Sequence, residues 1–97
     1  MVAPELTLYY REGCHLCEEM LQALRGLQPR LGFELRLVDV DRDSRLRQRY
    51  DEWVPVLSHR AAEICHYRLD EAALRRVIAE DAESRKRDHA RLGKRGK

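Results

Sequence analysis

The spacing of apolar and polar positions changes twice in the first part of the chain. Residues 6–10 are a short apolar run of strand-forming side chains that stops at Arg11-Glu12-Gly13. From Cys14 onward apolar residues recur every three or four positions, as in an amphipathic helix that ends near Gly32. Residues 33–37 then alternate apolar and polar before Val38-Asp39-Val40, which predicts a half-buried strand running into a buried one. The helical stripe consists of Cys17, Met20, Leu21, Leu24 and Leu27.

Four further elements are predicted in the second half of the chain. Asp43 or Ser44 can cap a short charged helix, and Asp70 can cap a last helix whose apolar stripe ends at Ile78. Two strands joined by a hairpin turn lie between these helices. In chain order the segments are a helix at 45–51, a strand at 54–57, a turn at 58–61, a strand at 63–67 and a helix from 71.

The predicted order is strand, helix, strand, helix, strand, strand, helix. A helix joins the first two strands, so we expect them to be parallel, and the last two strands are close enough to form an antiparallel hairpin. These elements predict an α/β fold in which three helices flank a four-stranded mixed sheet.

Length and charge divide the chain into one domain and a tail. Ninety-seven residues suffice for a single domain, which we place at residues 1–83. This part holds 12 arginines against 16 acidic residues, whereas residues 84–97 hold seven Lys and Arg against Asp88. We therefore expect a mildly acidic body and a basic tail that is disordered or a frayed helix.

These patterns also bear on location and partners. An acidic body argues against nucleic-acid binding by the domain, so only the tail is a candidate for such contacts. No apolar run is long enough to cross a membrane, and the N-terminus lacks the pattern of a secretory signal. We expect a cytoplasmic, monomeric protein.

Two cysteines mark the junction between the first strand and the first helix. Cys14 and Cys17 are three residues apart and so lie on one helix face, where their sulfurs can bond. The free amides and dipole of the helix N-terminus favour a thiolate at Cys14, which makes it the predicted nucleophile in disulfide exchange. Cys17 is on the core stripe and suits a resolving thiol. Arg11 and His15 are nearby groups that can further favour the thiolate.

A zinc site is the main competing interpretation of the cysteines. Zinc requires four Cys or His ligands, often as two pairs, and the second pair available is Cys65 with His66. Neighbouring strand residues point to opposite faces, so this pair is poorly arranged, although His59 is a possible substitute. We expect no metal, and we interpret Cys65 as a buried apolar residue.

The segment 9–17 (Tyr-Tyr-Arg-Glu-Gly-Cys-His-Leu-Cys), followed by 53–57 (Trp-Val-Pro-Val-Leu), resembles a glutaredoxin. More narrowly, it is similar to small bacterial glutaredoxin-like proteins with a C-x-L-C site. The resemblance covers about residues 5–80 and implies a thioredoxin fold, with a cis peptide bond before Pro55 facing the dithiol. In such a site the Val54 amide and carbonyl can pair with a thiol-bearing peptide as an added strand. The resemblance implies substrate-binding roles for Arg11, His15, Trp53, Val54 and Pro55.

The sequence also departs from the glutaredoxin pattern. His15-Leu16 replaces the usual Pro-Tyr, and Trp53 replaces the Thr before Val-Pro. Residues 65–70 contain no glycine where glutaredoxins use a Gly-Gly pair to approach glutathione closely. The resemblance therefore implies a thiol–disulfide oxidoreductase with weak glutathione binding.

The expected substrates are disulfides of proteins or small molecules. No bound cofactor is expected, glutathione is a possible co-substrate, and glutathione or a reductase would recycle the dithiol. Two alternatives stay open: a non-enzymatic binding module on the same fold, and a small zinc or nucleic-acid-binding accessory protein.

Overall fold

The computed structural model describes the backbone of residues 3–95 and the side chains through residue 84. The order of strands and helices is the predicted one, with an added 3-10 turn before the second helix. The elements are β1 (Glu5–Tyr10), α1 (His15–Leu31), β2 (Glu34–Asp39), η1 (Val40–Arg42), α2 (Ser44–Tyr50), β3 (Val56–His59), β4 (Ala62–His66) and α3 (Glu71–Arg95).

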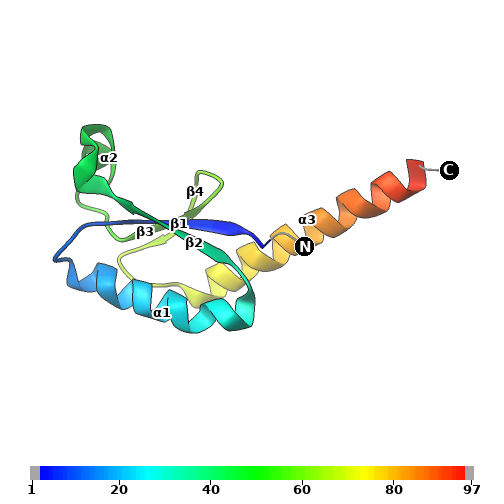
Figure 1. The fold of residues 1–97 in the computed structure, drawn as a ribbon, viewed down its shortest axis with the longest axis horizontal. Helices are drawn as coiled ribbons and strands as arrows, with labels where there is room; N and C mark the ends of the chain where they lie inside the picture. Colours follow the sequence, from blue (N-terminus) through cyan, green and yellow to red (C-terminus); the bar gives the residue numbers. More distant parts are fainter. Residues whose placement is uncertain (1–2, 96–97) are drawn as a thin grey trace.

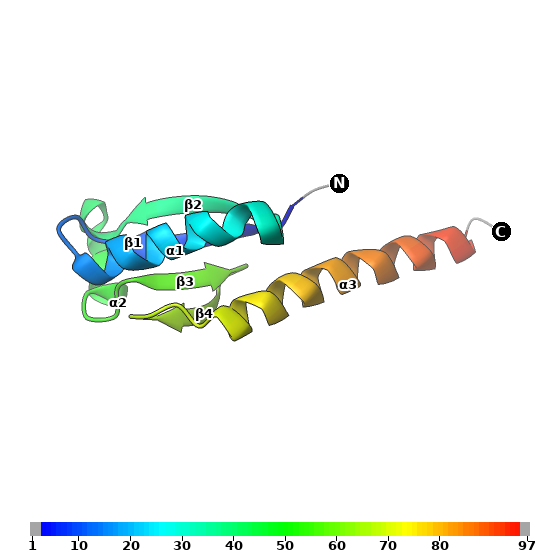
Figure 2. The ribbon, with the colours of Figure 1, turned by 90° about the horizontal axis from the view of Figure 1, so that it is seen from below.

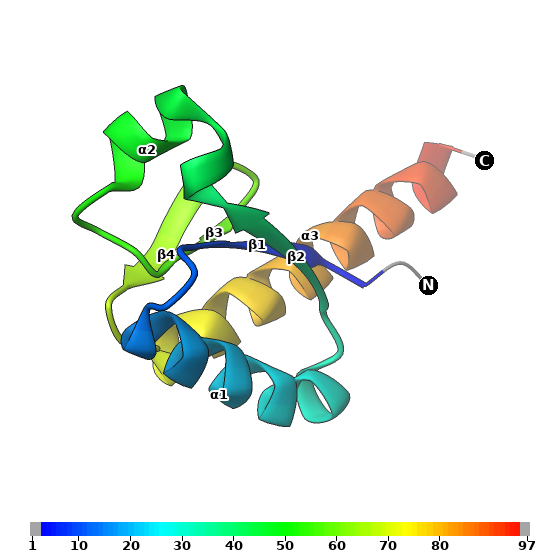
Figure 3. The ribbon, with the colours of Figure 1, turned by 60° about the vertical axis from the view of Figure 1, so that its left-hand side comes forward.

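The four strands form one mixed sheet in the order β2-β1-β3-β4. β1 and β2 are parallel and β3 and β4 form an antiparallel hairpin, both as predicted, and β3 also pairs antiparallel with β1. Helices α1 and α3 cover one face of the sheet, while the short α2 lies over the other (Figures 1 and 3). This is the predicted α/β architecture.

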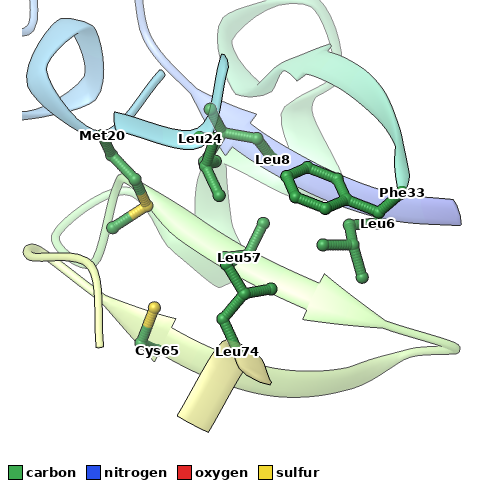
Figure 4. Packing of buried hydrophobic residues seen from close by; sticks show 8 residues of the cluster. All are labelled: Leu6, Leu8, Met20, Leu24, Phe33, Leu57, Cys65 and Leu74. Carbon is green, nitrogen blue, oxygen red and sulfur yellow. The ribbon is translucent and has the colours of Figure 1, made fainter. Parts of the chain in front are cut away.

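The hydrophobic core lies between the sheet and helices α1 and α3 (Figure 4). It includes Met20 and Leu24 from the predicted stripe of α1, each at most 2% exposed. Leu57 of β3 faces Leu74 of α3, and both are fully buried. The strand and helix patterns read from the sequence therefore identified the core-facing positions. The complete buried cluster is Leu6, Leu8, Met20, Leu24, Phe33, Leu57, Cys65 and Leu74.

The β3–β4 hairpin differs in detail from its predicted bounds. β3 begins at Val56 rather than at residue 54, because Val54 and Pro55, joined by a cis peptide bond, form the corner that precedes it. The turn is confined to Arg60 and Ala61, both with left-handed backbone at φ 51° and 67°. Two successive positive φ values are typical of the tightest hairpin turns, which favour Asn-Gly.

We expect Ala61→Gly to stabilise the protein. Glycine adopts positive φ without the steric cost that a Cβ imposes, so the unfolding free energy should rise by ~1 kcal/mol and Tm by about 4–8 °C. Thermal unfolding followed by circular dichroism measures both. The matched control is Ala62→Gly in β4, which should destabilise by ~0.5–1 kcal/mol because glycine weakens a strand interior. Equal effects of the two substitutions would contradict the turn geometry.

α3 extends well beyond the sheet (Figure 2). It continues as helix from the predicted Asp70 cap, whose carboxylate accepts from the Ala73 amide at 3.0 Å, through Arg95. A disordered segment or a frayed helix was predicted from residue 84, and α3 includes the backbone of this segment as far as Arg95. The division into a domain at 1–83 and a tail at 84–97 stays a prediction. None of the described helices carries an apolar stretch long enough to cross a membrane.

A buried carboxylate joins α3 to the tip of the hairpin. Asp81 is 6% exposed and lies 3.6 Å from both the His59 Nε2 and the Arg60 Nη2 atoms. The His59 side chain is itself only 15% exposed, so this histidine is not the surface residue that its position near a turn suggested. The contact holds the strained turn against the helix.

We expect Asp81→Ala to destabilise the fold by ~1–2 kcal/mol. Removing the carboxylate leaves the polar atoms of His59 without their buried partner, while the exposed Arg60 loses little. Urea unfolding measures the change. Glu80→Ala, at the neighbouring exposed position, is the control and should stay within ~0.5 kcal/mol of the parent. Similar losses in both variants would show that the buried contact contributes nothing.

Candidate active site

The dithiol lies where β1 passes into α1. Cys14 is the N-cap of α1, and its Sγ accepts a hydrogen bond from the Cys17 amide at 3.1 Å. The two sulfurs are at disulfide distance, and the Cα atoms are 5.2 Å apart, within the usual range for a disulfide. Gly13, with φ 74°, lets the chain turn directly before the helix.

The two cysteines differ in exposure. Cys14 is partly exposed at the helix end, whereas Cys17 is 3% exposed and belongs to the inner face of α1. A sulfur that caps a helix N-terminus receives both a backbone N–H and the positive end of the helix dipole, which favour its thiolate. The environment therefore suits an attacking sulfur at Cys14 and a shielded second sulfur at Cys17.

Arg11 forms ion pairs that the sequence did not predict. Its Nε lies 3.1 Å from Asp41 Oδ2, and its Nη2 is also paired with Asp51. These hydrogen bonds, first to Asp51 and then to Asp41, raise the pKa of the Arg11 guanidinium. The three side chains together carry net negative charge, so they supply no positive field for a Cys14 thiolate. Arg11 instead links the end of β1 to η1 and α2.

His15 is the first residue of α1 and points into solvent, with 83% of its side chain exposed. Its Nε2 is 3.7 Å from Glu19 one helical turn away. This placement leaves the ring accessible beside Cys14, and a role in substrate binding stays a prediction.

The sheet register brings the Val54–Pro55 corner to the same end of the sheet as the dithiol. Val56 pairs with Tyr9 of β1 on one side and with His66 of β4 on the other. The end of β1, the start of β3 and the end of β4 therefore lie in a row, and the two views of the ribbon agree (Figures 2 and 3). Pro55 directly precedes Val56 in this row, and its role in substrate binding stays a prediction.

One part of the predicted substrate edge needs correction. The Val54 amide donates to the Tyr50 carbonyl at 3.2 Å, and that carbonyl also accepts from the Trp53 amide at 2.8 Å. The reason is that α2 ends at Tyr50, where a last-turn carbonyl lacks a helical partner. The Val54 amide is thus engaged within the protein, and only its carbonyl can receive a substrate N–H.

Trp53 belongs to a cluster of aromatic rings beside this corner. It is 46% exposed, stacks on Tyr67 with 6.0 Å between ring centroids, and meets His66 edge-on at 5.3 Å. The Tyr67 hydroxyl donates to the Glu52 carbonyl at 2.7 Å, which fixes its ring. A role of Trp53 in substrate binding stays a prediction.

The sequence analysis did not identify Tyr67 as part of this cluster, and it considered His66 only as a possible zinc ligand. Tyr67 follows the end of β4 in left-handed backbone at φ 64°, and its amide donates to the Pro55 carbonyl at 2.9 Å. The sequence did contain a signal for Tyr67. This residue lies in the segment before Asp70 that has no glycine, where glutaredoxins use a Gly-Gly pair to approach glutathione. Tyr9, a second aromatic candidate, stacks on Tyr50 of α2 at 4.4 Å instead.

The third cysteine lies apart from the dithiol. Cys65 is 9% exposed within the core cluster, and burial raises the pKa of its thiol, so it is a poor nucleophile. Within the residues whose side chains are described, no three Cys, His, Asp or Glu side chains are grouped as metal ligands.

The profile of a known protein family matches the part of the chain that holds this site. The profile of the Glutaredoxin-like domain (DUF836) matches residues 5–79, which include the dithiol and the cis-proline corner. The chain belongs to the glutaredoxin-like family. An uncharacterized protein of Mycobacterium tuberculosis is 31% identical over 84 residues, with 81% of this chain and 87% of that protein covered.

Solved structures, a thioredoxin among them, agree with the fold. A protein from Nitrosomonas europaea is 44% identical with a TM-score of 0.68, covering 76% of this chain and 91% of that one. A protein from X. campestris is 33% identical with a TM-score of 0.62, covering 77% and 96%. Thioredoxin 1 of Thermosipho africanus, at 15% identity and a TM-score of 0.59 over 84% of this chain and 98% of its own, supports the fold alone. The architecture is the thioredoxin fold.

Proposed function

We propose that this glutaredoxin-like protein is a thiol–disulfide oxidoreductase that reduces disulfides through Cys14 and Cys17. The observation that carries the proposal is the unequal pair at the start of α1. Cys14 is partly exposed and accepts the Cys17 amide at 3.1 Å, while Cys17 is 3% exposed. Two thiols that differ in this way suit the two successive steps of disulfide exchange.

In the first step the Cys14 thiolate attacks one sulfur of a substrate disulfide. A Cys14–substrate disulfide forms, and the other substrate sulfur leaves as a thiolate that takes up a proton. Cys17 then loses its proton and attacks the Cys14 sulfur, which releases the second substrate thiol and leaves the Cys14–Cys17 disulfide. Two electrons pass from the protein to the substrate, and Cys17 supplies one of the two protons that the substrate thiols take up, while solvent supplies the other. The helix N-terminus stabilises the negative charge on Cys14 before its attack.

The reaction as proposed needs no bound cofactor. The oxidised pair must be reduced by two electrons from an external thiol, either glutathione or a dithiol reductase. The proposed substrates are disulfides of proteins or of small molecules, with the Val54 carbonyl as the backbone acceptor for an extended peptide.

A redox titration with thiol counting tests the proposal. The protein should show a reversible two-electron couple that consumes two thiols. Peptide mapping after alkylation should find one bridge, between Cys14 and Cys17, with Cys65 free. A dominant bridge to Cys65, or no reversible couple, would overturn it. In the latter case, stoichiometric zinc in the purified protein would favour a metal site, and its absence a non-enzymatic binding module.

A further inference from the structure

The exposed apolar side chains of the described residues gather at the dithiol end of the sheet. Between residues 3 and 84, the large hydrophobic side chains with high exposure are Leu37, Trp53 and Tyr67. Two of these three, Trp53 at 46% and Tyr67 at 39%, stack on each other beside the Pro55 corner. Exposed aromatic rings that are held together in this way form a ready apolar contact surface.

The backbone at Tyr67 is strained to place its ring in this pair. A tyrosine at φ 64° adopts a conformation that glycine takes without steric cost, and such residues cluster at ligand contacts. Hydrogen bonds fix both ends of the residue, from its amide to the Pro55 carbonyl at 2.9 Å and from its hydroxyl to the Glu52 carbonyl at 2.7 Å. The ring is thus ordered before any ligand arrives, which lowers the entropic cost of binding.

A hollow of about 430 Å³ continues from Trp53 along the α2 face of the hairpin. Trp53 and His66 line its end nearest the dithiol, and Ser58 and Ala61 line the end nearest the turn. The hollow therefore runs beside β3 and offers room for a few residues of extended chain. Its remaining lining residues are Arg49, Tyr50, Val56 and Glu63.

We propose that Trp53 and Tyr67 form a subsite for an apolar side chain that flanks the reactive cysteine of a polypeptide substrate. β4 lies two strands from β1, so the pair is ~10 Å across the sheet from the strand that leads to Cys14. Extended chain covers that distance in about three residues. A large apolar residue two or three positions from the substrate cysteine would lie on the two rings while the cysteine meets Cys14. The subsite rests on the proposed function and adds a substrate class: polypeptide disulfides with aromatic or large aliphatic residues near the cysteine.

The test compares two fluorescence-quenched peptide disulfides with pre-reduced protein in single turnover. The peptides are identical except for Phe or Ser at the second and third positions on both sides of the cysteine. The wild-type protein should react about tenfold faster with the Phe peptide at subsaturating concentration, equivalent to ~1.4 kcal/mol. Trp53→Ser should lower this ratio to about one. Tyr67→Gly should lower it severalfold, and its backbone is compatible with φ 64°, so the fold is not at risk.

Val77→Ser is the control, because Val77 is a partly exposed apolar residue of α3 that lies beside the hairpin turn, at the end of the sheet away from the dithiol. This variant should keep the wild-type ratio, and it should react with hydroxyethyl disulfide, which has no flanking side chain, at the wild-type rate. Equal wild-type rates with the two peptides, or an unchanged ratio in both aromatic variants, would overturn the subsite while leaving the oxidoreductase intact. Failure of the wild type to react with any disulfide would instead overturn the proposed function.

Discussion

Cys17→Ser should accumulate mixed disulfides with its substrates, whereas Cys14→Ser should lose disulfide reduction and trap almost nothing. In the first variant the partly exposed Cys14 keeps its place at the N-terminus of α1 and still attacks, but no buried thiol is left to resolve the product. In the second, the remaining Cys17 is 3% exposed and a substrate disulfide cannot reach it. Non-reducing electrophoresis and mass spectrometry of the adducts measure the difference.

Cys65→Ala serves as the control for these variants. Cys65 is a core residue whose thiol pKa is raised by burial, so its removal should leave both reduction and trapping unchanged. Equal trapping by the two active-site variants, or more trapping by Cys14→Ser, would reverse the assigned roles. Loss of trapping in a Cys17→Ser, Cys65→Ala double variant would identify Cys65 as the trapped thiol instead.

The parts of the site that could be predicted are those that depend on the spacing of nearby residues along the sequence. The helical period starting at Cys14 placed Cys17, Met20 and Leu24 on one face, and the structure buries all three. Cys14 precedes this stripe at the end of an apolar strand, so its position at a helix N-terminus followed from the same pattern. Connection lengths also predicted the parallel pair of β1 and β2 and the antiparallel β3–β4 hairpin, but not the pairing of β1 with β3.

The partners of Arg11 were not predictable from spacing. Asp41 and Asp51 are 30 and 40 residues away in the sequence, and the chain holds 17 acidic residues that could have served equally well. Only the packing of η1 and α2 against the end of β1 selects these two. The sequence therefore suggested a free cation beside the dithiol, whereas the structure contains a paired one.

The last helix was predicted, but the burial of one of its polar residues, Asp81, was not. The apolar stripe stops at Ile78, which suggested that packing stops there too. Asp81 lies one turn further on the same face, and it is buried because His59 and Arg60 of the hairpin meet it. From the sequence alone, a carboxylate at a core-facing position is interpreted as solvent-exposed, because its ion-pair partners cannot be identified.

We expect the protein to reduce glutathione mixed disulfides only weakly, well below an ordinary dithiol glutaredoxin. Three observations support this. The Val54 amide already donates to the Tyr50 carbonyl, and the charge of Arg11 is balanced by two carboxylates. Tyr67, which has a side chain, occupies the position where a glycine would let glutathione approach the backbone closely. Losing one or two hydrogen bonds to a small ligand costs ~1–3 kcal/mol, or about 5- to 150-fold in affinity.

The hydroxyethyl disulfide assay coupled to glutathione measures this activity, and insulin reduction with dithiothreitol as reductant is the companion assay. Both rates are expressed relative to the same glutaredoxin standard, and the rate of insulin reduction should be lowered no more than the glutathione-dependent rate. The reason is that a polypeptide can also contact the Val54 carbonyl and the Trp53–Tyr67 surface. Tyr67→Gly should raise the glutathione-dependent rate, since it restores a side-chain-free position beside Pro55. Turnover with glutathione equal to that of the standard in the unaltered protein would contradict the prediction. It would mean that glutathione binds here without the Val54 amide and without a glycine at the end of β4.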